Sequence, residues 1–152
     1  MFYRLPGSCG FYGCPVPGRS FMKWYESNPI RFEIEKRLLA KAHPGCRLVI
    51  KDGRMKLQKT LQLRKNCYQI EGIFSDNYPY SHMRFFVFSP PLKNSPPHRY
   101  GDGELCTHGS SDVSSETTAK VYLDWAIQWL QTYERWLDGE PWPETCKSSW
   151  VS

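Results

Sequence analysis

A cysteine flanked by two histidines is the combination of residue types in this chain that is best suited to chemistry. Cys106 lies between His98 and His108 in a segment rich in proline and glycine, Pro90–His108, with the sequence PPLKNSPPHRYGDGELCTH. A cysteine thiolate is a strong nucleophile, and an imidazole can accept or return a proton at neutral pH. A turn-rich loop cannot bury a core of its own, and loops held by rigid flanks often carry function. We therefore expect this segment to form an active site with Cys106 as its nucleophile.

The charges near Cys106 leave the ionisation of its thiol open. A free cysteine titrates near ~8.5, and a nearby positive charge or helix N-terminus lowers that value. Asp102 and Glu104 would oppose ionisation if they lie close to the sulfur. Each candidate also has a structural alternative. Cys106 could be a plain buried cysteine, His98 a brace for the loop, His108 an exposed loop residue, and Asp102, between two glycines, a turn residue.

Length, charge and cysteine spacing exclude several classes of protein. The chain has 152 residues, which is enough for one domain with a core of its own. Its net charge of +5 is spread along the sequence, whereas a nucleic-acid binder more often has a clustered basic face. The six cysteines contain no C-x-x-C pair, which argues against zinc and disulfide frameworks. No secretory signal and no run of transmembrane length are apparent, so we expect a reduced, cytoplasmic protein without membrane or nucleic-acid partners.

The elements that must hold the loop begin with a helix. Asn28 is a suitable N-cap and is followed by proline at the first helical position, so we expect a helix over residues 29–42. Ile30, Ile34 and Leu38 recur at four-residue spacing and form one apolar stripe, the pattern of an amphipathic helix.

Strand patterns follow this helix and lead up to the loop. Asp52-Gly53 predicts a hairpin turn. The four strand-like runs cover residues 47–51, 55–63, 68–74 and 82–89. After the loop, a Ser/Thr-rich lead-in over residues 110–118 precedes a long apolar helix that ends at Asp138-Gly139. A helix, an antiparallel meander of four strands, the active-site loop and a long C-terminal helix together predict an α+β fold.

This order of parts resembles the ubiquitin-conjugating (UBC) family. In that family the corresponding motifs read roughly YPF and PP, then HPN, then GxICL with the catalytic cysteine. The matching groups here are Tyr78-Pro79-Tyr80, Pro90-Pro91, His98-Arg99-Tyr100 and Gly103-Glu104-Leu105-Cys106. The similarity covers about residues 28–140, so we expect a UBC-like catalytic domain over residues 28–152. Residues 1–27, which are rich in glycine and proline, are expected to form an irregular N-terminal extension.

The departures from the family pattern point to one branch of it. Tyr100 stands where the family has the asparagine of HPN, the interval from His98 to Cys106 is shorter than usual, and Thr107-His108 follows the cysteine instead of Leu-Asp. With the tryptophan-rich C-terminal helix and tail, these differences are similar to a divergent bacterial branch of the family. Those proteins are encoded with cGAS-like nucleotidyltransferases in CBASS anti-phage operons.

The resemblance implies a thioester relay. Cys106 would carry the C-terminus of a cGAS-like nucleotidyltransferase or of a ubiquitin-like protein, and would pass it to a lysine on a target. His98 matches the histidine of the family, and His98, His108 and Asp102 are the candidates for accepting the proton of the amine. Tyr100 would supply a hydroxyl hydrogen bond in place of the missing asparagine. The site needs no cofactor, and an activating enzyme must act upstream because the chain has no glycine-rich phosphate loop.

The sequence is compatible with three functional classes. The first is the conjugating enzyme, with Cys106 as acyl carrier. The second is a Cys-His hydrolase that cleaves such a conjugate, although the sequence offers no clear third residue to orient the base. The third is a catalytically inactive UBC-like binding module, whose members usually lack the cysteine. The first two differ in whether an adduct is transferred to an amine or released to water.

Overall fold

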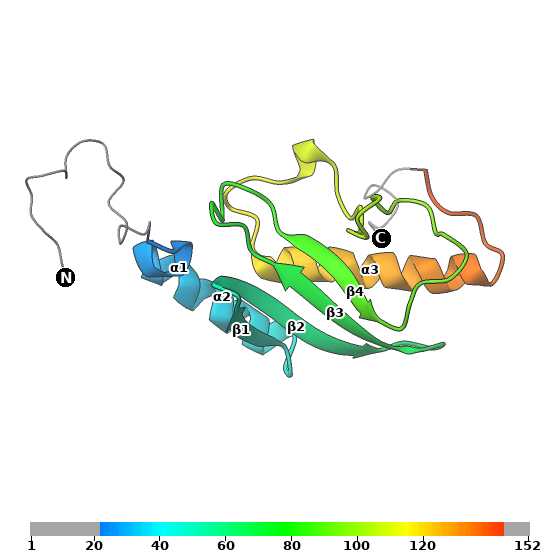
Figure 1. Ribbon diagram of the computed structural model, residues 1–152, viewed down its shortest axis with the longest axis horizontal. Coiled ribbons are helices and arrows are strands. Elements are labelled where there is room, and N and C mark those ends of the chain that lie inside the picture. Colours follow the sequence, from blue (N-terminus) through cyan, green and yellow to red (C-terminus); the bar gives the residue numbers. More distant parts are fainter. Residues whose placement is uncertain (1–21, 145–152) are drawn as a thin grey trace, which may run out of the picture.

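The computed structural model describes residues 22–144 as an antiparallel sheet with helices before and after it (Figure 1). The elements in chain order are α1 (Trp24–Ser27), α2 (Pro29–Ala42), β1 (Arg47–Lys51), β2 (Arg54–Gln62), β3 (Cys67–Ile73), β4 (Arg84–Ser89), the 3-10 helix η2 (Ser110–Asp112) and α3 (Ala119–Leu137). The expected α+β class and the order of elements of a UBC-like fold are confirmed. Helix α2 has the bounds that the sequence predicts, and the strands differ from prediction by one or two residues at their ends.

The sheet is a simple meander with the order β1-β2-β3-β4, and every neighbouring pair is antiparallel. The predicted hairpin turn joins β1 to β2, where Asp52 and Gly53 have φ angles of 56° and 73°. Two successive positive φ angles are required by the two-residue turn that best matches strand twist, and Asp-Gly tolerates them well. Strand β4 is left at one edge of the sheet, beside the segment that carries Cys106.

Helix α3 lies along one face of the sheet and supplies much of the core (Figure 1). Trp129 and Leu130 of this helix are fully buried, as are Leu57 of β2 and Ile70 of β3. Burial of a large apolar side chain contributes about 1.5–3 kcal/mol to folding. The long helix and the sheet are therefore a rigid base for the loop between β4 and α3.

Helix α2 is rotated about its axis so that its apolar stripe lies toward solvent. Ile30, Ile34 and Leu38 are 75%, 45% and 36% exposed, so the apolar stripe seen in the sequence is not the face that packs on the core. The side chains that α2 buries are those of Glu35 and Leu39, which are 0% and 3% exposed. Because the charged residue Glu35 lies at the centre of the buried face, the spacing of apolar residues does not identify that face.

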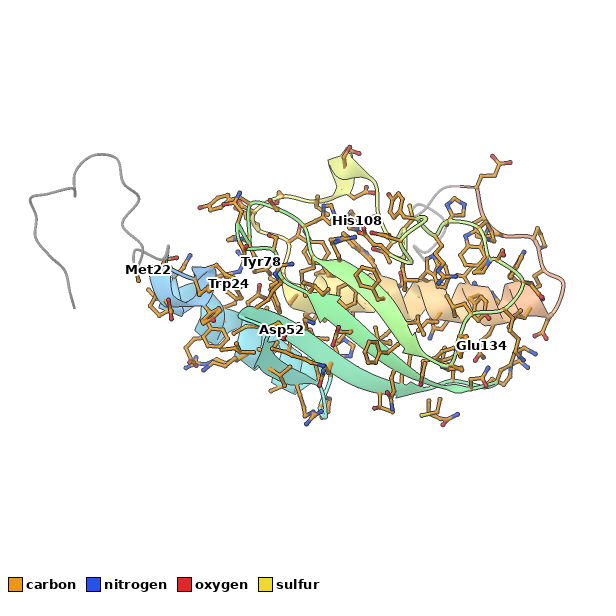
Figure 2. All side chains as sticks on the ribbon, in the orientation of Figure 1. Met22, Trp24, Asp52, Tyr78, His108 and Glu134 are labelled. Carbon is orange, nitrogen blue, oxygen red and sulfur yellow. The ribbon has the colours of Figure 1, made fainter. Side chains whose placement is uncertain are left out.

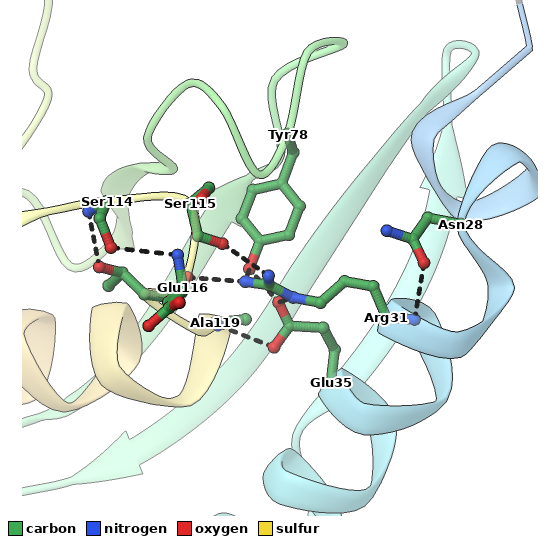
Figure 3. A network of polar contacts seen from close by, with 9 residues as sticks. Asn28, Arg31, Glu35, Tyr78, Ser114, Ser115, Glu116 and Ala119 are labelled. Atoms are coloured by element: carbon green, nitrogen blue, oxygen red, sulfur yellow. Dashed lines mark hydrogen bonds and ion pairs between the residues drawn. The ribbon is translucent and has the colours of Figure 1, made fainter.

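The buried Glu35 carboxylate fixes this rotation through a polar network (Figure 3). One oxygen accepts the backbone N–H of Ala119, the first residue of α3, at 3.0 Å. The other accepts the Arg31 Nε–H at 3.1 Å and the Tyr78 hydroxyl. Arg31 also donates to the carbonyl oxygen of Ser115 at 2.6 Å. A buried carboxylate is stable only with partners of this kind, so α2, the Tyr78 turn and the lead-in to α3 are held as one unit.

The short helix α1 belongs to the same end of the core. Its Trp24 is only 6% exposed and lies against Tyr78, with ring centroids 4.7 Å apart (Figure 2). Residues 24–27, expected within the irregular N-terminal extension, therefore form a packed helix instead, because Trp24 gains aromatic partners in the core. Residues 1–21 of that extension lie outside the described residues.

Candidate active site

The segment before Cys106 is docked on the edge strand of the sheet. Arg99 and Leu105 form an isolated antiparallel bridge, and the Leu105 backbone N–H donates to the carbonyl oxygen of Phe85 in β4 at 2.9 Å. The Leu105 side chain is 2% exposed. A buried apolar anchor and a strand-like hydrogen bond thus fix the backbone one residue before the candidate nucleophile.

The chain between Arg99 and Leu105 is a tight turn that includes Asp102. The Gly103 N–H donates to the carbonyl oxygen of Tyr100 at 2.9 Å, and Gly103 has a φ of 98°. That value lies in the region that glycine adopts without steric cost. The Tyr100 ring is 52% exposed and lines the cavity described below. Glycine at this position lets the turn reverse the chain and bring Tyr100 near Cys106.

The carbonyl oxygen of His98 connects Cys106 to the core. It accepts the Cys106 backbone N–H at 2.9 Å and the indole N–H of the fully buried Trp129 at 2.9 Å. His98 has a φ of 58°, a left-handed conformation that costs a non-glycine residue energy. Its ring stacks on Trp142, with centroids 5.8 Å apart. These contacts give His98 a bracing role for the loop, because its carbonyl and its ring both hold the chain to α3 and the following segment.

Cys106 lies on the wall of a cavity of about 410 Å³. The candidate residues Tyr100, Asp102 and His108 line the same cavity, and so does His82. Cys106 itself is partly exposed. His98 is not among the lining residues. The structure thus brings together four of the five residues that the sequence singles out, whereas the ring of the fifth, His98, contacts Trp142.

An arginine organises the acidic residues on the cavity wall. Arg84 of β4 pairs with Asp102 through one nitrogen and with Glu104 through another, the second contact at 3.0 Å. The backbone N–H of Glu104 also donates to Asp102 at 3.0 Å. This backbone hydrogen bond and the charge of Arg84 lower the pKa of Asp102. Both carboxylates therefore have a cation to offset their charge near Cys106.

His108 is a neutral imidazole in a largely apolar setting. Its ring lies 5.5 Å from that of Tyr122 and 5.4 Å from that of Trp125, and its Nδ1 is 2.9 Å from the Thr107 hydroxyl. Burial is the main cause that lowers the pKa of His108 to about 4, and the charge of the neighbouring His82 contributes to the same shift. At neutral pH this ring is uncharged, so it can exchange hydrogen bonds without placing a positive charge in the cavity wall.

His82 also lines the cavity, although the sequence does not single it out. Its Nε2 is 3.6 Å from Glu104, and its ring is 5.1 Å from that of His108. It belongs to the short connection before β4, far from Cys106 in the sequence and outside any motif. His82 lies just before β4, the edge strand beside the loop. This position indicates a place in the site once the strand order is known.

The site can therefore supply a nucleophile, neutral or protonatable imidazoles and paired carboxylates around one cavity. Within residues 22–144, no cluster of His, Cys, Asp and Glu side chains is suited to hold a metal ion. None of the helices described in that range is long and apolar enough to cross a membrane.

The chain matches a known protein family. The family model described as type II CBASS E2 protein matches residues 35–148, a range that includes every residue of the site. A search of curated proteins finds no match.

Proposed function

The chain belongs to the type II CBASS E2 proteins, and from this premise we propose that it carries the C-terminus of a protein partner as a thioester on Cys106 and transfers it to an amine. The family places an E2-like protein in CBASS defence, as the resemblance of the residues implied. The observation that supports the relay best is the presentation of Cys106. Its backbone is held by the His98 carbonyl at 2.9 Å, while its side chain lines an accessible cavity.

The proposed partners follow from the family. The conjugated carboxylate is the C-terminus of a cGAS-like nucleotidyltransferase or of a ubiquitin-like protein, activated upstream by a separate enzyme. The acceptor is a lysine amine on a target protein. The site needs no cofactor, because an acyl group already activated as an adenylate or thioester can pass to a thiolate without one.

The residues around Cys106 have distinct proposed roles. His98 braces the loop through its carbonyl and its ring, and Asp102 holds the turn together through Arg84 and the Glu104 backbone. Tyr100 offers a hydroxyl at the cavity wall for the carbonyl oxygen of the thioester. His108 gives a neutral donor or acceptor on the wall of the same cavity.

A Cys-His hydrolase is the second candidate, and one observation favours it. The sequence offers no clear residue to orient a base, whereas in the structure Glu104 lies 3.6 Å from the His82 imidazole. A carboxylate, an imidazole and a thiol around one cavity can release an acyl group to water as well as to an amine. The third candidate, an inactive binding module, is disfavoured by the presence of Cys106 on the cavity wall.

Trapping at Cys106 tests the proposal. The protein is expressed with the other proteins of its operon, and wild type, Cys106→Ser and Cys106→Ala are compared by intact mass under non-reducing conditions. We expect a thiol-sensitive adduct on wild type, a thiol-resistant adduct on the serine variant and none on the alanine variant. Cys67→Ser is the matched control, because Cys67 is an exposed free cysteine at the start of β3. It should form the same adduct as wild type.

The mass of the adduct identifies the carried protein. Absence of an adduct in all variants, with the activating enzyme present, would contradict the conjugating function. An adduct that decays to the free carboxylate with no transfer to any amine would favour the hydrolase instead.

A further inference from the structure

Transfer from Cys106 to an amine requires a base that the candidate residues from the sequence do not supply well. The lysine ammonium has an ordinary pKa of ~10.4, so only about one lysine in 10³ is neutral at pH 7.4. The proton that leaves the nitrogen during attack must be accepted by a group within hydrogen-bond reach. The acceptor must therefore line the Cys106 cavity and have a free lone pair.

We propose that His82 is the general base of the transfer step, a role that rests on the proposed conjugating function. His82 lines the same cavity as Cys106. Its side chain is 47% exposed, so an incoming amine can reach it from solvent. Imidazole is the side-chain base whose ordinary titration range lies closest to neutral pH.

The other possible bases on the cavity wall are weakened by ion pairs or by burial. Asp102 accepts the Glu104 backbone N–H and pairs with Arg84, and both interactions lower its pKa and weaken it as a base. Glu104 pairs with Arg84 at 3.0 Å, and its side chain is only 12% exposed. His108 has a pKa of about 4 because it is buried, and its Nδ1 contacts the Thr107 hydroxyl. A base this weak gains little from accepting a proton at neutral pH.

Glu104 acts as the positioning residue for His82. Its Oε2 is 3.6 Å from His82 Nε2, while its Oε1 is held by Arg84 Nε at 3.0 Å. Glu104 lies on the Nε2 side of the ring, so we assign Nδ1, the other ring nitrogen, to the incoming amine. When Nδ1 takes up a proton, the imidazolium lies beside a negative charge that stabilises it. The His108 ring also contacts His82 edge-on, with ring centroids 5.1 Å apart.

The transfer step then balances without any further reactant. The amine nitrogen forms a bond to the acyl carbon of the thioester, and the proton of the amine passes to Nδ1 of His82. The carbon–sulfur bond breaks, and the Cys106 sulfur leaves with the electron pair as a thiolate. The His82 imidazolium returns its proton to the thiolate or to solvent, which restores the enzyme.

Single-turnover discharge of a preformed thioester isolates this step. A synthetic peptide thioester of a small thiol loads Cys106 by exchange, excess peptide is removed, and decay is followed by intact mass after addition of lysine. The variants are His82→Gln, Glu104→Gln and the control His43→Gln, which changes a histidine that contacts Asp124 away from this cavity. Circular dichroism and thermal melts establish that each variant is folded.

We expect His82→Gln to load normally and to discharge to lysine about 10²-fold more slowly at pH 7, with a loss that shrinks as the pH rises. Discharge to hydroxylamine, a stronger nucleophile that is largely unprotonated at neutral pH, should be slowed much less. Glu104→Gln should show a smaller loss and a shifted pH profile, and His43→Gln should match wild type. Equal discharge of wild type and His82→Gln to lysine would overturn the role of His82 and leave the thioester intact. Failure of wild-type Cys106 to load from the peptide or from its operon partners would overturn the conjugating function itself.

Discussion

Trp129 donates its indole N–H to the carbonyl oxygen of His98 at 2.9 Å, which ties the middle of α3 directly to the loop that presents Cys106. The same oxygen accepts the Cys106 backbone N–H at 2.9 Å. One carbonyl therefore links the buried core to Cys106. The tryptophan-rich face of α3 has a second role besides packing, because one of its polar atoms sets the position of the loop.

Substitution Trp129→Phe tests this link, because it keeps an aromatic ring and removes the donor. Loss of a buried hydrogen bond and of some packing should lower the free energy of unfolding by about 1–3 kcal/mol. The rate at which Cys106 accepts an acyl group should fall more than the stability change alone explains, since the loop is no longer held. Urea denaturation and single-turnover loading of Cys106 measure the two effects.

The matched control for this substitution is Trp136→Phe, the same chemical change nearer the end of α3, at a partly buried position. It should leave the loading rate close to that of wild type. Equal loading rates for the two variants would show that the indole hydrogen bond does not position Cys106.

Stability measurements on α2 separate its exposed stripe from its buried face. Leu39→Ala should cost about 2–5 kcal/mol, because Leu39 is 3% exposed and its removal leaves a cavity. Ile34→Ala should change stability much less, by about 1 kcal/mol or below, since Ile34 is 45% exposed. Urea midpoints of the two variants give the comparison. A larger loss for Ile34→Ala than for Leu39→Ala would mean that α2 packs with the face that its sequence pattern suggests.

Local signals predicted the parts of the fold that depend on nearby residues. Asn28 accepts the Arg31 N–H at 3.1 Å as the expected N-cap of α2, and Asp52-Gly53 forms the expected turn. The rotation of α2 could not be predicted, because Glu35 is buried through partners that lie far away in the chain, at Tyr78 and Ala119. Periodicity counts apolar residues and cannot identify a charge whose partners come from other elements.

The candidate site likewise contains residues that local sequence identifies and residues that only distant contacts bring in. Cys106 belongs to the family motif and His108, two residues later, departs from it, and both line the cavity. His98 also belongs to the motif, yet its ring is directed to Trp142, a partner that its local sequence does not indicate. His82 joins the site only because β4 pairs at the edge of the sheet and the loop folds back onto it. Such contacts depend on strand order, which a single sequence does not contain.

The free energy of unfolding should depend on pH through the titration of His108. Burial and the nearby His82 lower its pKa to about 4 in the folded protein, whereas an imidazole in an unfolded chain titrates near ~6.5. Between these two values the unfolded chain binds a proton that the folded protein does not, so stability should fall as the pH is lowered from about 6.5 to about 4. Because His108 is only partly buried, solvent screening reduces the loss from this residue to about 1–2 kcal/mol.

Urea denaturation at closely spaced pH values measures this slope, and His108→Gln should flatten it, since glutamine cannot take up the proton. The difference between wild type and the variant should appear between pH 4 and 6.5 and be constant above pH 7. NMR titration of the His108 ring provides a direct check, and its Cε1 proton should not shift between pH 5.5 and 8. A midpoint near neutral pH, or an unchanged slope in the variant, would mean that the ring is solvated and free to carry charge beside Cys106. In that case His108 would compete with His82 as the base for transfer.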